Sequence, residues 1–66
     1  MTLGERMLQY RAKHHISQGE LAHLLDTNLM AIYRCEKGCF KMHKANEARL
    51  QNKMNWLEKE EVVKNV

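Results

Sequence analysis

Three side chains that could bind a metal ion follow one another at intervals of four residues: Cys35, Cys39 and His43. Thiolates and imidazoles at spacings of two to four are typical ligands of Zn²⁺, and a structural zinc site needs four of them in a tetrahedron. No fourth ligand lies in register with these three, and Cys35 falls where a helix would turn it toward the core. We therefore expect no metal site.

Catalytic chemistry has less support still. No Ser or Cys nucleophile has an orienting base in register, and no glycine-rich loop that could cradle a phosphate is present. A chain of 66 residues also leaves little room for a substrate pocket. We expect no enzymatic activity, no cofactor and no binding of small molecules.

Positive charge is concentrated in one part of the chain. The net charge is +3, and all of it lies in residues 1–44, because residues 45–66 hold equal numbers of basic and acidic side chains. The segment 34–44 alone carries four Lys or Arg against one Glu. Such a cluster is either a contact surface for phosphate groups or a solvated face, and charge alone does not decide between the two.

Size and composition favour a single helical domain. The chain has no proline and only three glycines, so little interrupts a helix. Its apolar runs are far shorter than the ~20 residues that a membrane-spanning helix needs. We expect one soluble domain over residues 1–66, no contact with a membrane, a cytoplasmic location and reduced cysteines.

Two capping boxes predict the first two helices. A Ser or Thr followed three residues later by Glu lets each side chain bond the backbone N–H of the other residue. These pairs are Thr2 with Glu5 and Ser17 with Glu20. We expect helices over about 3–14 and about 18–25.

Polar residues after the second helix predict a turn and then two further helices. "DTN" at 26–28 competes for backbone hydrogen bonds and supplies a cap, whereas Gly38 suits the residue just past a helix end. We expect a third helix over about 28–37, a basic loop, and a last helix over about 45–61. Leu50, Met54 and Leu57 form the apolar stripe of that last helix.

Two short helices joined by a tight turn describe a helix-turn-helix. The segment "SQGELAHLLDTNLMAIYRCEKG", residues 17–38, resembles the helix-turn-helix of the Cro/C1-type (XRE-like) family of phage, plasmid and bacterial regulators. The matching positions are Ser17, Gln18, Glu20, Leu21, Ala22, Leu25, Ile32, Glu36 and Gly38. The resemblance implies a compact all-α domain of four to five helices, similar to lambda repressor.

Two departures from the family pattern concern the turn and the end of the third helix. Asp26 stands where the family often has Gly, and Asp can adopt the left-handed conformation at some cost. Cys35 replaces a larger apolar residue. Both positions therefore affect local geometry more than the overall fold.

Some of the matching residues have structural roles. Ala22 is small where the second and third helices would cross, and Ile32 is expected to bury that crossing. The family commonly pairs an Arg late in the first helix with an acid at the end of the third, and Arg11 and Glu36 occupy these positions.

The resemblance also assigns contacts with double-stranded DNA. The base-reading positions on the third helix are Leu29, Met30, Tyr33 and Arg34. Arg34 could bond guanine O6 and N7, whereas Leu29 and Met30 offer only apolar contact, for which thymine methyl groups are the natural target. The expected phosphate contacts, which position the protein without reading sequence, are Gln18, Asn28, Lys37, the Gly38 backbone, Lys41 and Lys44.

The expected function is sequence-specific DNA binding by a small transcriptional regulator of phage or mobile-element type, acting as a repressor through promoter occlusion. Such readers usually bind pseudo-palindromes as homodimers. The last helix, with Trp56, Leu57, Val62 and Val63, is the candidate dimer surface, although Trp56 could instead belong to the core.

Two alternatives remain open. The exposed Leu29–Met30–Tyr33 surface could bind another protein, as an antirepressor or an antitoxin-like partner would. The chain could also bind DNA as a recombination-directing architectural factor.

Overall fold

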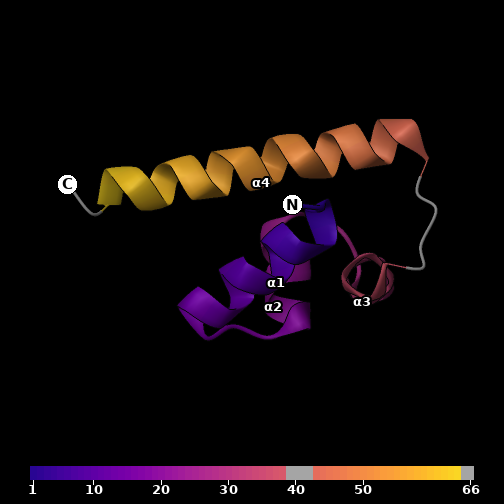
Figure 1. Ribbon diagram of the computed structural model, residues 1–66, viewed down its shortest axis with the longest axis horizontal. Coiled ribbons are helices and arrows are strands. Elements are labelled where there is room, and N and C mark those ends of the chain that lie inside the picture. Colours follow the sequence, from indigo (N-terminus) through magenta and orange to yellow (C-terminus); the bar gives the residue numbers. More distant parts are fainter. Residues whose placement is uncertain (39–42, 65–66) are drawn as a thin grey trace.

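Four α-helices make up the part of the chain that this computed structural model describes, residues 1–38 and 43–64, with the backbone alone for 61–64. They are α1 (Leu3–His14), α2 (Gln18–Leu24), α3 (Leu29–Lys37) and α4 (Lys44–Lys64). The described residues contain no strand. Helix α4 lies across the layer formed by the three shorter helices, with α3 below the end at which α4 begins (Figure 1). The predicted all-α fold class is confirmed.

Both predicted capping boxes are present. At α1, Glu5 N donates to Thr2 Oγ1 at 3.1 Å and Thr2 N donates to Glu5 Oε1 at 2.7 Å. At α2, the same two bonds join Ser17 and Glu20 at 3.1 and 2.8 Å. The hydrogen bonds at Thr2, backbone first, lower the pKa of Glu5. These caps explain why both helices begin where the sequence predicts.

The turn between α2 and α3 spans Leu25 to Asn28. Asp26 has a φ of 56°, which is the left-handed conformation that its position in the turn requires. Thr27 N donates to Ala22 O at 2.9 Å, so the turn is bonded back onto α2. Asn28 Oδ1 accepts from Ala31 N at 2.9 Å and caps α3. Helix α2 ends one residue earlier than predicted because Leu25 already departs from helical geometry.

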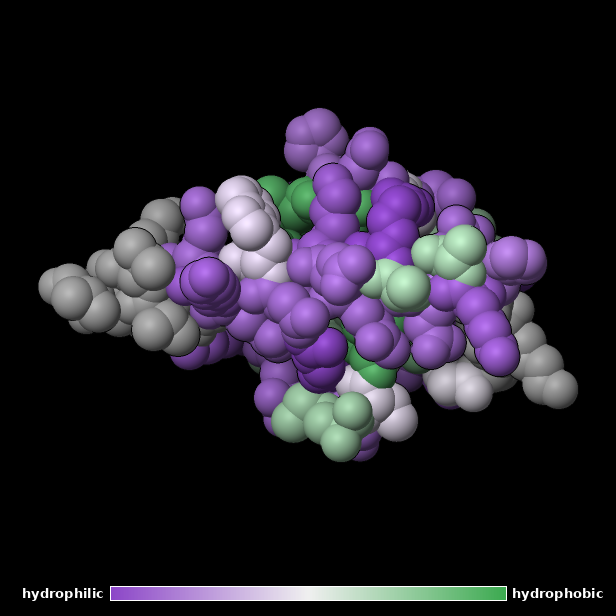
Figure 2. Space-filling view, turned by 90° about the horizontal axis from the view of Figure 1, so that it is seen from above, coloured by the Kyte–Doolittle hydropathy of each residue, from purple (hydrophilic) through white to green (hydrophobic). Residues whose placement is uncertain are grey.

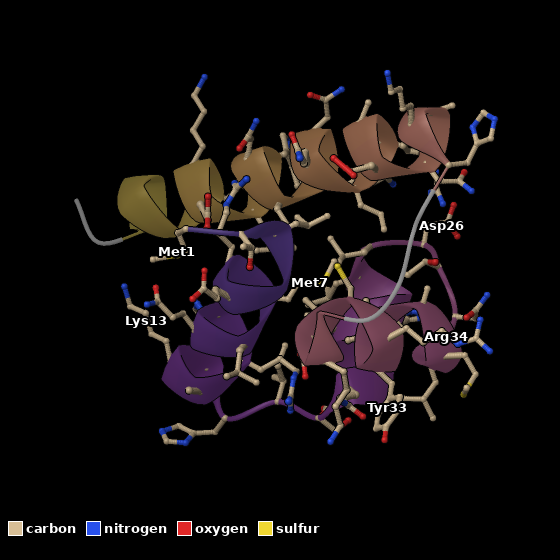
Figure 3. All side chains as sticks on the ribbon, turned by 45° about the vertical axis from the view of Figure 1, so that its right-hand side comes forward. Met1, Met7, Lys13, Asp26, Tyr33 and Arg34 are labelled. Carbon is tan, nitrogen blue, oxygen red and sulfur yellow. The ribbon has the colours of Figure 1, made fainter. Side chains whose placement is uncertain are left out.

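One apolar core joins all four helices. Its fully or almost fully buried side chains are Met7, Leu21, Ala22, Leu25, Ile32, Leu50, Met54 and Leu57. Met7 points from α1 into the space between the helices (Figure 3). Helices α1 and α2 both pack against α3, and α4 packs against α1. The core therefore holds α3 from its inner side and leaves its outer side uncovered.

Helix α4 differs from the prediction at both ends. It begins at Lys44 and continues to Lys64, whereas the predicted helix covers about 45–61. Residues 62–64 include no Gly or Pro, and two valines cost a helix only a few tenths of a kcal/mol each, about the size of ordinary propensity differences. Arg6 ties α4 to α1 through an ion pair with Glu58 Oε1 at 2.7 Å.

Candidate nucleic-acid interface

The outer side of α3 carries large side chains that the fold leaves exposed. Leu29, Met30 and Tyr33 are 50, 53 and 43% exposed. Tyr33 points from α3 away from α4 (Figure 3), whereas Arg34 lies at the cleft between α3 and α4. On the opposite side, Ile32 is buried in the core. The four predicted base-reading positions thus lie together on one accessible helix face, as their spacing requires.

Two basic side chains border these apolar ones on α3. Lys37 Nζ lies 5.5 Å from the centroid of the Tyr33 ring, one helical turn away, so the two form a cation–π pair. Arg34 lies in the last turn of α3 with Lys37. The face therefore combines apolar surface with positive charge.

The one acidic residue of α3 is turned away from this face. Glu36 accepts from Arg11 Nε at 2.7 Å and Arg11 Nη2 at 2.8 Å, and its side chain is only 5% exposed. Burial alone would raise the pKa of Glu36, but the hydrogen bonds from Arg11 and Gln18 together with the Arg11 charge outweigh it and lower that pKa. The bond to Glu36 raises the pKa of Arg11. The ion pair expected from the family pattern is present.

Gln18 takes part in the same cluster. Its Nε2 donates to Glu36 Oε1 at 3.0 Å. The sequence predicts a phosphate contact for this side chain, but in the structure one of its N–H groups is already used inside the protein. Gln18 therefore fixes the start of α2 to the end of α3.

One further predicted phosphate contact, that of the Gly38 backbone, needs correction. The Gly38 N–H donates to Arg34 O and Cys35 O, each at 3.1 Å, because Gly38 closes α3 in the left-handed conformation with a φ of 76°. This N–H is therefore not available to a phosphate. Lys44 lies in the first turn of α4 rather than in the predicted loop, and its phosphate contact stays a prediction. Lys41 and Cys39 lie outside the described residues.

Sequence reasoning missed the contribution of α4 to this surface. Asn46 and Arg49 line a cleft of about 360 Å³ with Asn28 and Arg34. Arg49 Nη1 donates to Asp26 O at 3.2 Å, which ties α4 to the turn before α3. The signal that could have indicated these residues is their position on α4: Asn46 lies four residues and Arg49 one residue before Leu50, beside the buried stripe.

A second exposed apolar site lies away from α3. Trp56 is 58% exposed and Leu24 is 45% exposed, and together with Asn52 and Lys53 they line a groove of about 340 Å³. The alternative that Trp56 belongs to the core is therefore wrong. Leu57, proposed from sequence for a dimer surface, is buried. Seen from above, onto α4, the molecular surface is largely hydrophilic (Figure 2).

Neither a cluster of metal-ligating side chains nor a membrane-spanning helix is found in the described residues, 1–38 and 43–64. No three His, Cys, Asp or Glu side chains there converge closely enough to hold a metal ion. Burial raises the pKa of the Cys35 thiol, which therefore favours the neutral form. None of the helices in this part of the chain has both the length and the apolar character needed to cross a bilayer.

Comparisons with protein-family models, with curated proteins and with solved structures found no match to this chain.

Proposed function

We propose that this chain binds double-stranded DNA in a sequence-specific manner and acts as a small transcriptional regulator of the phage or mobile-element type. The observation that carries the proposal is the composition of the outer side of α3. Apolar Leu29 and Met30 lie there with Arg34 and Lys37, whereas Glu36 is held on the inner side by Arg11 and Gln18.

The dimensions of α3 suit this role. A helix with its side chains is about 10–12 Å across, and the major groove of B-DNA is about 12 Å wide. Within the groove, Leu29 and Met30 would contact thymine methyl groups and Arg34 would bond a guanine. Occlusion of a promoter needs nothing beyond this binding.

We propose further that two copies bind a pseudo-palindromic site. Exposed Trp56 and Leu24 supply an apolar patch for a second copy. Lys53 and Glu60 flank Trp56 on one side of α4, seven residues apart. In an antiparallel pair of α4 helices, Lys53 of one copy would face Glu60 of the second copy, so this surface is complementary to itself.

The experiment that tests the proposed function compares two double variants by fluorescence anisotropy on a random-sequence duplex across a salt series. Arg34→Ala with Lys37→Ala should abolish binding at near-physiological salt, because both cations are removed. Leu29→Ala with Met30→Ala should leave this non-specific binding nearly intact. All four side chains are exposed, so melting temperatures should change little.

A second candidate function is binding to another protein through Leu29, Met30 and Tyr33. The half-exposed state of all three side chains favours it. On this alternative, the wild-type protein shows no DNA binding at physiological salt. The Leu29→Ala, Met30→Ala variant, rather than the Arg34→Ala, Lys37→Ala variant, then loses a partner recovered by pull-down.

A further inference from the structure

The cleft between α3, with the turn before it, and the first turns of α4 has the chemistry of an anion site. Asn28 and Arg34 line it from one side and Asn46 and Arg49 from the other, with Ala31 and Leu50 between them. No Asp or Glu is among the described residues that line it. Two guanidinium groups from different helices therefore meet two amide side chains around one space of about 360 Å³.

Arg49 is held in position by its bond to the turn. Its Nη1 donates to the carbonyl oxygen of Asp26, an interaction that uses one of the five N–H donors of a guanidinium group. The planar fork leaves further donors, and this geometry suits the oxygens of a phosphate group. A tethered guanidinium also loses less conformational freedom when it binds a ligand than a fully mobile one does.

The cleft is continuous with the outer side of α3. Met30 and Arg34 belong both to the lining of the cleft and to the exposed face that carries Leu29 and Tyr33. A duplex that received α3 in its major groove would therefore bring one strand's backbone to the mouth of the cleft. This is the reason to assign the ligand to DNA and not to a free phosphate compound.

We propose that this cleft binds a backbone phosphate of the DNA strand beside the groove that α3 enters, with Arg49 and Asn46 as its ligands from α4. The inference rests on the proposed DNA-binding function. It extends the interface from α3 onto a second helix, and it supplies affinity and register without reading sequence.

The first test is Arg49→Gln, with Lys59→Gln as the matched control. Lys59 is exposed on the same helix, ten residues or about 15 Å further along its axis, and its substitution removes the same charge. Anisotropy on several labelled duplexes of different sequence should show about a tenfold loss of affinity for Arg49→Gln, uniform across sequences. Its log–log salt slope should also become less steep by about 0.9.

A second variant leaves the hydrogen bond between Arg49 and Asp26 O intact. Asn46→Asp places a negative charge in the cleft, near the start of α4 where an acid is compatible with the helix. Asn55→Asp makes the same chemical change on α4 outside the cleft and outside the groove at Trp56, nine residues or about 14 Å further along, and it keeps the side-chain oxygen that accepts from Arg6 Nη2. We expect Asn46→Asp to weaken DNA binding without lowering the melting temperature, and to do so more strongly than Asn55→Asp.

The outcomes separate this inference from the proposed function. If the wild type binds DNA and the cleft variants bind as well as their controls, the phosphate site is wrong and the DNA-binding proposal stands. If the wild type does not bind DNA, both proposals fail. A saturable rise in melting temperature with inorganic phosphate, lost in Arg49→Gln while DNA affinity is unchanged, would overturn the assignment to DNA and identify free phosphate as the ligand.

Discussion

Gly4 provides a direct test of how α1 packs on α3. It is buried in the first turn of α1, and a Cβ at this position would overlap the carbonyl oxygen of Cys35. The same Cβ would lie 2.9 Å from Cys35 C and 3.2 Å from Glu36 Cα. All three atoms belong to the backbone of α3, so no side-chain rotation relieves the overlap. Gly4→Ala must therefore push the two helices apart.

The expected cost of Gly4→Ala follows from this geometry. Overpacking a core costs typically about 1–3 kcal/mol, and we expect about 3 kcal/mol because two helix backbones must separate. The better helix propensity of alanine offsets only about 0.5–1 kcal/mol of this. A domain of 66 residues has a total stability of roughly 3–10 kcal/mol, so the variant should lose a large part of it.

Gly19 supplies the matched control. It also lies in the first turn of its helix, but a Cβ there meets only Ser17 Oγ at 3.8 Å, an ordinary contact. Gly19→Ala should therefore stabilise the protein by about 0.5–1 kcal/mol. Urea unfolding followed by far-UV circular dichroism measures both values. Equal free energies of unfolding for the two variants would refute the close approach of α1 and α3.

Three further predictions concern the ion pair, the turn and the exposed tryptophan. Because the pKa of Glu36 lies below its ordinary value of 4.5 in the folded protein, its contribution to stability should be complete above that pH and disappear as the pH falls through the lowered pKa. At neutral pH, Arg11→Met should lower the free energy of unfolding by about 2–4 kcal/mol, near the range for buried ion pairs that lose one partner. An unchanged free energy in urea unfolding would contradict a stabilising role for this ion pair. Asp26→Gly should stabilise the protein by roughly 0.5 kcal/mol because it relieves the left-handed conformation, whereas Asp26→Val should destabilise it by about 1–2 kcal/mol; the reverse order would show that the turn has another geometry. Trp56→Ala should weaken self-association in sedimentation equilibrium and leave monomer stability within about 0.5 kcal/mol, as expected for a surface residue.

Local signals in the sequence predict much of the fold. The capping boxes at Thr2 and Ser17 fix helix starts because each involves only residues three apart in the chain. Gly38 predicts the end of α3 in the same way, since its left-handed conformation is a local property. The stripe of Leu50 and Met54 predicts the buried side of α4, because helical spacing places them on one face.

The side-chain and backbone contacts that the sequence did not predict all join distant segments. Nothing local in the sequence places Gly4 against Cys35, Arg6 against Glu58 or Arg49 against Asp26, because each pair depends on how the helices cross. The Arg11–Glu36 pair was predicted only through the family resemblance. Trp56 is apolar enough for the core, and only the packing of α4 shows that its ring is exposed.

Selection on random duplexes gives the clearest test of the proposal that α3 reads DNA sequence. The purified protein would be incubated with the duplex pool at near-physiological salt, and bound sequences would be recovered over several rounds. We expect enrichment of a two-fold symmetric motif that contains thymines and a guanine in each half-site, and loss of this enrichment in Arg34→Ala. An asymmetric or tandem motif would favour a recombination-directing factor. Absence of any enriched motif, with binding that vanishes as salt rises, would contradict the claim.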